Sequence, residues 1–391
     1  MEINTITNVV KVFGLSALSF VLAIFLTPLL TNLMYKYKLW RKDVRELSPD
    51  GSQTPLFAAL HKDRETSVPR LGGVLIWVTT ILVALLFWII AQVTDDPFWD
   101  KVNFLSRNQT WLPLFILLAS SLLGLADDLL QVFRKGNYVA GGIKPPTFSE
   151  DAKPKISFIR KLLSVLKPWR QNTQEGGGVK FRHRLLAVFF IALAGALWFH
   201  YKLGWQTIYI PGLGDLFING WYIPLFVGTM ILLFSSSIVD GIDGLSGGVF
   251  ASIFAAYGGI AFFRGQIDIA AFSGVILGAL LAFLWFNIPP ARFYMGESGM
   301  LGLTTALTVI AFLTDSVIVL PVIGFILMAE VASDVLQFAS KRFRGKKIFL
   351  IAPIHHHFEA IGWPPYKVTM RFWIVGVVAA IVGMVIALIG R

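Results

Sequence analysis

The sequence predicts an all-α polytopic membrane protein with about ten transmembrane helices. Of its 391 residues, 55% are apolar and only 15% are charged, and the mean hydropathy is +0.69, whereas soluble domains carry about 25% charged residues. Apolar runs of roughly 20 residues, long enough to cross a hydrocarbon layer about 30 Å thick, recur along the chain. The absence of cysteine excludes disulfides, thiolate metal sites and a cysteine nucleophile.

Ten apolar runs are interpreted as spans within one integral-membrane domain, residues 1–391. They are Val9–Met34, Leu71–Val93, Trp111–Ala126, Arg184–Phe199, Tyr222–Val239, Leu245–Phe263, Ile269–Ile288, Met300–Leu313, Val317–Ala339 and Met370–Ile389. The third, fourth and eighth are short, so their ends are the least defined. The first run lacks a basic start and is too long for a cleaved signal, which predicts an uncleaved helix. Small residues between Gly274 and Ala282 suit close helix packing in lipid.

Basic residues decide the expected orientation. Of the 34 Lys and Arg residues, all but six lie beside the connections that follow odd-numbered spans. The six are Lys11, Lys101, Arg107, Lys202, Arg264 and Arg391. Lys and Arg accumulate in cytoplasmic loops, so both termini are expected in the periplasm and any cleft among the inner helix ends on the cytoplasmic face. The net charge of +11 is spread over several loops, which argues against nucleic-acid binding.

Two connections carry structure of their own. The outer segment Tyr201–Gly220 includes Ile208-Tyr-Ile-Pro-Gly-Leu-Gly214, which could form a small hairpin. The inner loop 131–183 has Ile159, Leu162 and Leu166 at helical spacing among cations. This pattern favours a helix near 155–169 lying in the lipid headgroup layer over an ordinary basic linker.

Chemistry-bearing residues gather at the expected cytoplasmic helix ends. They are Asp127 and Asp128 after span 3, Asp240 and Asp243 after span 5, Asn287 at the end of span 7, Tyr294 and Glu297 before span 8, and His355, His356, His357 and Glu359 before span 10. Each cluster alone has a plain structural reading, such as a polar helix boundary or an Asp-Gly turn. Together they place several carboxylates on one side among many cations. Carboxylates without thiolates suit Mg²⁺, and nearby Lys and Arg suit a diphosphate.

The triplet His355-His-His357 is a weak zinc candidate, because adjacent helical residues point about 100° apart and rarely converge on one ion. Hydrogen bonding to a phosphate or sugar, with one imidazole held by Glu359, is the favoured role. Glu330 and Asp334 lie four residues apart in span 9 and should face the bundle or a wet cleft. Glu330 is assigned a supporting role.

In this order, the clusters resemble the polyprenyl-phosphate N-acetylhexosamine-1-phosphate transferase superfamily. Ala352-Pro-Ile-His-His-His-Phe-Glu359, followed by Gly362-Trp363, resembles its phospho-N-acetylmuramoyl-pentapeptide transferase branch, as do Ala329–Gln337 and Gly345–Ile348. The resemblance covers spans 2 to 10. It implies a ten-helix inner-membrane enzyme, often a homodimer among membrane lipids, that uses Mg²⁺. The implied reaction joins UDP-MurNAc-pentapeptide to undecaprenyl phosphate, giving lipid I and UMP.

The resemblance also implies residue roles. The catalytic group would be Asp127, Asp128, Asp240, His355, His356 and His357; the substrate-binding group Arg70, Asp243, Asn287, Tyr294 and Glu359; and the Mg²⁺ ligand Glu297. In the family, an Asp usually stands at Glu297, a Lys at Gln131, an Asn at Ser237 and a Thr at Arg70. Arg70 is closer to the branch that makes N-acetylglucosamine lipids, which is therefore the alternative function. A transporter is the alternative from another class, but transporters place charges near the bilayer midplane in repeated, broken helices, and no repeat is evident.

Overall fold

The computed structural model describes residues 3–41, 67–105, 108–133 and 178–389. Within these ranges, nine helices are long and apolar enough to cross a membrane, and a bent helix pair makes a tenth span if it is counted as one. Beyond these helices the described residues form only short helices and a two-stranded sheet. The predicted all-α polytopic membrane fold is confirmed. The predicted helix near 155–169 lies outside the described residues.

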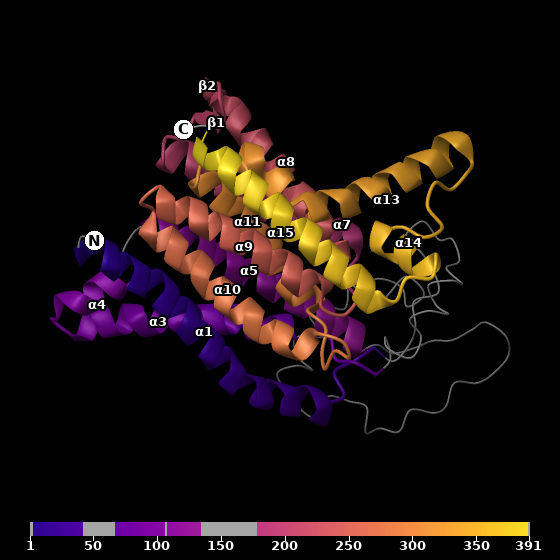
Figure 1. The fold of residues 1–391 in the computed structure, drawn as a ribbon, viewed down its shortest axis with the longest axis horizontal. Coiled ribbons are helices and arrows are strands. Elements are labelled where there is room, and N and C mark those ends of the chain that lie inside the picture. Colours follow the sequence, from indigo (N-terminus) through magenta and orange to yellow (C-terminus); the bar gives the residue numbers. More distant parts are fainter. Residues whose placement is uncertain (1–2, 42–66, 106–107, 134–177, 390–391) are drawn as a thin grey trace.

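Both termini lie at one end of the bundle, as Figure 1 shows. Helix α1 (Ile3–Lys36) starts there, and Lys11 forms an ion pair of 2.6 Å with Asp268 at the start of α10 (Ile267–Asn287). At the same end, Arg264 donates a hydrogen bond of 2.8 Å to the carbonyl of Ala387, near the end of α15 (Pro365–Ile389). This end is called the terminal end below, and the other the site end. Termini on the same side agree with an even number of crossings.

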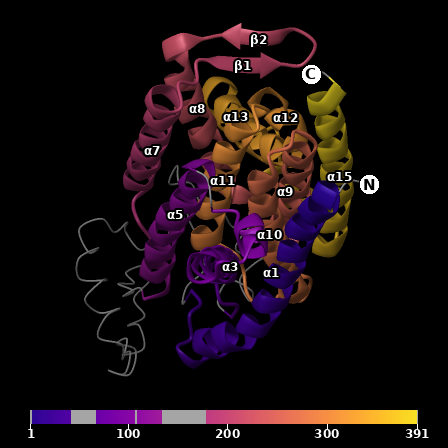
Figure 2. The ribbon, with the colours of Figure 1, turned by 90° about the vertical axis from the view of Figure 1, so that its left-hand side faces the viewer.

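Helix α11 (Gly296–Leu313) is the centre of the bundle (Figure 2). It packs against α3 (Gly73–Val93), α5 (Asn108–Val132), α8 (Tyr222–Ser235) and α9 (Leu245–Phe263). Its threonines Thr304, Thr305 and Thr308 donate their hydroxyls to carbonyls one turn earlier, which satisfies polar groups buried in an apolar core. The helix can therefore be fully surrounded by protein.

Glycines bring neighbouring helices into close contact. A Cβ atom on Gly278 of α10 would lie 2.0 Å from the carbonyl oxygen of Ser16 on α1, so the expected close packing of Gly274–Ala282 is present. A Cβ atom on Gly124 of α5 would lie 2.2 Å from the carbonyl oxygen of Glu297 on α11. Because small residues let backbones approach closely, Gly124 lets α5 pack onto the first turn of α11.

Most predicted spans coincide with helices, but several ends differ. Helix α5 continues to Val132, so Asp127 and Asp128 lie inside the helix and not beyond its end. Helix α7 (Phe181–Leu197) continues as a π-helical turn (Trp198–Lys202), and α8 as a 3-10 turn (Ser236–Val239). The predicted fifth span already ended at Val239, whereas α5 and the π-helical turn after α7 extend beyond the predicted ends Ala126 and Phe199, because their last residues are polar and hydropathy alone stops too early. The predicted hairpin is confirmed: β1 (Thr207–Ile210) pairs antiparallel with β2 (Gly214–Phe217).

The ninth predicted span is not one continuous helix. It consists of a 3-10 turn (Val317–Val319), α12 (Leu320–Ile323) and α13 (Phe325–Arg344), which are bent by 80° at Gly324. From Glu330 onward, α13 carries acids, amides and a basic end, a composition that is costly in hydrocarbon. This polar half extends beside α14 (Ile354–Ala360) (Figure 1), where its side chains find partners.

Candidate active site

The first turn of α11 collects two carboxylates from other helices. Asp128 of α5 accepts hydrogen bonds from the backbone amides of Glu297 (3.0 Å) and Ser298 (2.9 Å). Asp240, just after α8, accepts from the amide of Gly296 (2.9 Å) and from the hydroxyl of Ser246 (2.9 Å). The first amides of a helix have no partner within the helix and carry positive partial charge. They stabilise the buried Asp128 and the partly buried Asp240 and hold the two carboxylates at the same helix end.

Gly296 is required for this arrangement. Its φ of +70° is in the left-handed region, and a Cβ atom there would lie 1.8 Å from the carbonyl oxygen of Arg70 and 2.8 Å from Asp128 Oδ2. The chain before α3 is paired with the chain before α11, through Gly72 N–H to Tyr294 O and Tyr294 N–H to Pro69 O, both 2.8 Å. These contacts bring Arg70 to the site beside Asp240.

Arg184, near the start of α7, links two acids of the site. Its Nη1 lies 2.7 Å from Glu297 Oε1 and 3.4 Å from Asp127 Oδ2. From the sequence, Arg184 was placed only at the start of the predicted span Arg184–Phe199, so this role was missed. No local motif marks it, because its two partners are 57 and 113 residues away along the chain. The available signal was an arginine at the start of a span, on the same expected side of the membrane as the acidic clusters.

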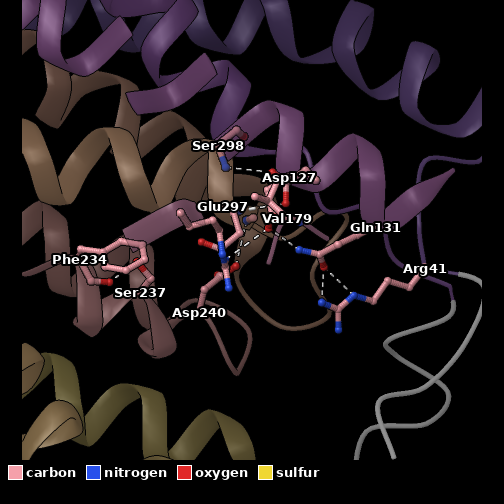
Figure 3. Close-up of polar contacts among 12 residues, drawn as sticks. Arg41, Asp127, Gln131, Val179, Phe234, Ser237, Asp240, Glu297 and Ser298 are labelled. Carbon is pink, nitrogen blue, oxygen red and sulfur yellow. Dashed lines mark hydrogen bonds and ion pairs between the residues drawn. The ribbon is translucent and has the colours of Figure 1, made fainter. Parts of the chain in front are cut away.

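Asp127 has two further donors. Its Oδ1 accepts the amide of Val179 (2.5 Å), and its Oδ2 accepts the side-chain amide of Gln131 (2.6 Å). Gln131 in turn accepts from the guanidinium of Arg41, at 2.9 Å from Nε (Figure 3). Ser237, another departure from the family pattern, turns its hydroxyl back to the carbonyl of Phe234 (2.7 Å). Four carboxylates, Asp127, Asp128, Asp240 and Glu297, therefore surround the α11 N-terminus.

The three histidines of α14 have different partners. His355 Nδ1 lies 2.9 Å from Glu330 Oε2, His356 Nδ1 lies 2.6 Å from Glu359 Oε2, and His357 Nδ1 accepts the amide of Leu350 at 3.2 Å. The expected pairing of one imidazole with Glu359 is present, and Glu330 supports His355. The triplet does not converge on one point, which agrees with the argument against a zinc site.

Helix α14 packs onto the turn that carries Asp240. A Cβ atom on Gly241 would lie 2.2 Å from His355 Nε2 and 3.0 Å from His356 Nε2. Helix α13 holds the preceding loop in place. Gln337 accepts from the amides of Ile348 and Phe349, and Ser333 accepts from the amide of Ile354. His355 and His356 are thereby brought beside the acidic turn, whereas His357 is turned toward its own loop.

Asp243 and Asn287 lie together next to this turn. Asn287 accepts from the amide of Gly244 (3.0 Å) and donates to the carbonyl of Phe293 (2.8 Å), while Asp243 Oδ2 accepts from the amide of Ala291 (3.2 Å). Tyr294 is buried. These residues shape the connection between α10 and α11, and their predicted contacts with a nucleotide stay predictions.

Burial and charge shift two groups in the connecting segments. Burial raises the pKa of Asp240 above its usual value, against the opposing effects of Arg70 and the Gly296 amide. Burial alone would lower the pKa of His355, but the Glu330 carboxylate outweighs it and the pKa is raised. Both groups therefore tend to hold a proton more strongly than they would in water.

The carboxylate set is suited to Mg²⁺. In the part of the chain that the structure describes, no three His, Asp or Glu residues are grouped to enclose a metal. Mg²⁺ does not need such a cage, since it commonly binds through one or two carboxylates, waters and substrate phosphates. Glu297 Oε2 is buried without a hydrogen-bond partner, as expected of an oxygen that binds a ligand. Glu297 and Asp127 fit the ion's chemistry.

A family model and individual known proteins both match this chain. The family described as Glycosyl transferase family 4 matches residues 177–315, which include Arg184, Asp240 and Glu297. The chain is 32% identical to the phospho-N-acetylmuramoyl-pentapeptide-transferase of Levilactobacillus brevis, over 82% of this chain and 85% of the relative. It is 31% identical to the protein of that name from Geobacillus sp. (strain WCH70), and 29% identical to the one from Bacillus subtilis (strain 168), over 94% of this chain and 95% of the relative in both cases.

Proposed function

The chain belongs to the phospho-N-acetylmuramoyl-pentapeptide-transferase family, and from this we propose that it transfers phospho-MurNAc-pentapeptide from UDP-MurNAc-pentapeptide to undecaprenyl phosphate. The products are lipid I and UMP. One observation carries the proposal at the site: four buried or partly buried carboxylates and Arg184 meet at the N-terminus of α11, beside the histidines of α14.

The chemistry requires positioning and charge stabilisation more than a strong base. A phosphate monoester has a second pKa near 6, so the lipid phosphate is largely dianionic at pH 7. Its oxygen attacks the β-phosphorus of the UDP-sugar, the bond from that phosphorus to the bridging oxygen breaks, and the electron pair leaves with UMP. A new diphosphate links the sugar to the lipid.

Asp127 is better placed than Asp128 to face the reacting groups. Both oxygens of Asp128 accept backbone amides of α11, which gives it an architectural role. Asp127 Oδ2 faces Arg184 next to Glu297. We assign Asp127 the orientation of the lipid phosphate and the removal of any residual proton, and Arg184 the binding of phosphate charge. His355 and His356 contribute hydrogen bonds to the donor substrate.

Mg²⁺ is part of the proposal. The residues that would hold it are Glu297 and Asp127, and the ion supplies neutralisation of diphosphate charge when bound. If substrate phosphates took the place of Glu297 as partners of Arg184, Glu297 would be free to hold the ion and Arg184 would bind phosphate charge. The location proposed is the bacterial inner membrane, with both termini in the periplasm and the site end at the cytoplasmic face. The homodimer implied by the resemblance is also a proposal.

The transfer is tested with purified protein, by measuring UMP release from UDP-MurNAc-pentapeptide. Release is expected to require both undecaprenyl phosphate and Mg²⁺, with lipid I as the second product. Release of UMP without the lipid, together with a phosphorylated aspartate, would contradict direct attack. No UMP release with any sugar nucleotide would contradict the transferase function and favour the transporter alternative.

A further inference from the structure

Asp127 is connected through two buried side chains to the segment that follows α1. The guanidinium of Arg41 donates to Gln131 Oε1 from both Nε and Nη2, with 2.9 Å for the Nε contact. Gln131 Nε2 then donates to Asp127 Oδ2 at 2.6 Å. Arg41, Gln131 and Asp127 are only 4%, 6% and 1% exposed, so water does not compete with these contacts. Figure 3 shows the three side chains in sequence.

The direction of this connection is fixed by chemistry. An Arg guanidinium has donors and no acceptor, whereas a Gln side chain has an acceptor oxygen and a donor NH₂ group. Arg41 therefore requires the oxygen of Gln131 to face it, which turns the NH₂ group toward Asp127. Residues four apart on a helix share a face, so Gln131 is correctly placed on α5 for this contact. Without Arg41, the buried oxygen of Gln131 would lose the donor that holds the side chain in place, so the amide could turn away from Asp127.

The contact also determines which way Asp127 faces. Its Oδ1 is held by the amide of Val179, and its Oδ2 is shared between Gln131 and the more distant Arg184. If the Gln131 donor is lost, Oδ2 keeps only the Arg184 contact of 3.4 Å. The carboxylate would then be held closely only at Oδ1, by Val179, and could turn Oδ2 away from the geometry that the transfer needs.

We propose that Arg41 is a positioning residue that acts through Gln131 to hold the Asp127 carboxylate in its reactive orientation. The inference rests on the proposed function, because Asp127 is assigned its role there. In this arrangement Gln131 connects a cation in the segment after α1 with a carboxylate of the site.

The test compares UMP release by variants of the full chain. Arg41→Met should lower kcat about tenfold to a hundredfold, the effect expected for losing a hydrogen bond to a charged group. KM for UDP-MurNAc-pentapeptide should stay near the wild-type value, since neither residue is assigned to substrate binding. Arg41→Lys retains a donor for Gln131 and should keep most of the rate.

Two further variants distinguish a relay, meaning the connection from Arg41 through Gln131 to Asp127, from simple packing of these side chains. Gln131→Glu keeps a partner for Arg41 but places an acceptor oxygen against Asp127, so kcat should fall while the melting temperature is preserved. In the double variant Arg41→Met with Gln131→Lys, the new ammonium can reach Asp127 directly from the same helix face. This double variant should recover most of the rate that Arg41→Met loses.

Arg264→Met is the matched control. Arg264 is a partly buried arginine at the terminal end that donates to the Thr314 carbonyl, the Ser316 hydroxyl and the Ala387 carbonyl. Its loss should lower the melting temperature and leave kcat of the folded protein unchanged. Full kcat in Arg41→Met or in Gln131→Glu would overturn the relay. So would failure of Gln131→Lys to restore the rate. In each of these cases wild-type protein releases UMP, whereas an inactive wild type would instead overturn the proposed function.

Discussion

The two ends of the bundle use buried charge differently. At the terminal end, Lys11 pairs with Asp268 at 2.6 Å and also donates to the carbonyl of Asn103, and Arg264 donates to three oxygens. At the site end, four carboxylates meet at the first turn of α11, and Glu297 Oε2 accepts no hydrogen bond. The cations at the terminal end bind a carboxylate, carbonyls and a hydroxyl of neighbouring elements and hold these elements together. The acid excess at the site end is suited to binding a cation and phosphates.

The largest difference between the ends should appear in catalysis. Glu297→Gln removes the charge of the proposed Mg²⁺ ligand and should lower kcat for UMP release about a hundredfold to a thousandfold. Asp268→Asn removes a carboxylate at the terminal end and should leave kcat unchanged. Glu297→Asp should keep part of the rate. Full activity in Glu297→Gln would show that the metal role is assigned to the wrong residue.

Backbone strain should also distinguish the ends. Gly296 and Gly265 both have positive φ, +70° and +72°, but a Cβ atom at Gly296 meets the Arg70 carbonyl, whereas one at Gly265 meets nothing within 4 Å. Gly265→Ala should cost about 1–2 kcal/mol of stability. Gly296→Ala should cost about 3 kcal/mol or more, because steric overlap adds to the strain. Equal losses in denaturant unfolding would contradict the close approach at Gly296.

At the terminal end, the expected effect is on stability alone. Lys11→Met leaves the Asp268 carboxylate without its ion pair and should destabilise the fold by about 3 kcal/mol. Thermal unfolding in detergent measures this loss, and the kcat of the remaining folded protein should equal that of the wild type. A reduced kcat at unchanged stability would link the terminal end to the reaction and remove the contrast between the ends.

The smallest expected effect is a pH dependence from His355. Its folded-state pKa is raised above the unfolded value of 6.5, chiefly because the Glu330 carboxylate outweighs burial. The imidazolium therefore contributes stability that is complete below pH 6.5 and is lost as the pH rises through the folded pKa. The melting temperature should fall over that window in the wild type and less so in Glu330→Gln. The raised pKa of Asp240 also makes stability fall with rising pH, in a separate window that begins at about pH 3.8.

Much of the fold could be predicted because hydropathy is a local property. Apolar runs located the spans, and the Pro-Gly turn located the hairpin. The bend at Gly324 could not be predicted in this way, because the whole run from Val317 to Ala339 is apolar enough for a span. The bend follows from where the polar half of α13 finds its partners, namely Ser333 and Gln337 against the loop before α14. Such partners become visible only in three dimensions.

The site shows the same limit. Local motifs pointed to Asp127, Asp128, Asp240, Glu297 and the histidines, and the structure places most of these around one helix end. Arg184 and Arg41 were missed as site residues, because their partners are distant along the chain. The partners of Arg184 are 57 and 113 residues away, and the partner of Arg41 is 90 residues away. Gln131 was noted only as a departure from the family pattern, and the structure shows that it connects Arg41 with Asp127.

The choice of donor substrate tests the central claim most directly. UMP release by the wild-type protein is measured with UDP-MurNAc-pentapeptide and, in parallel, with UDP-GlcNAc, each with undecaprenyl phosphate and Mg²⁺. We predict release from UDP-MurNAc-pentapeptide and little or none from UDP-GlcNAc. Release from UDP-GlcNAc alone would contradict the assignment and place the activity in the other branch of the superfamily.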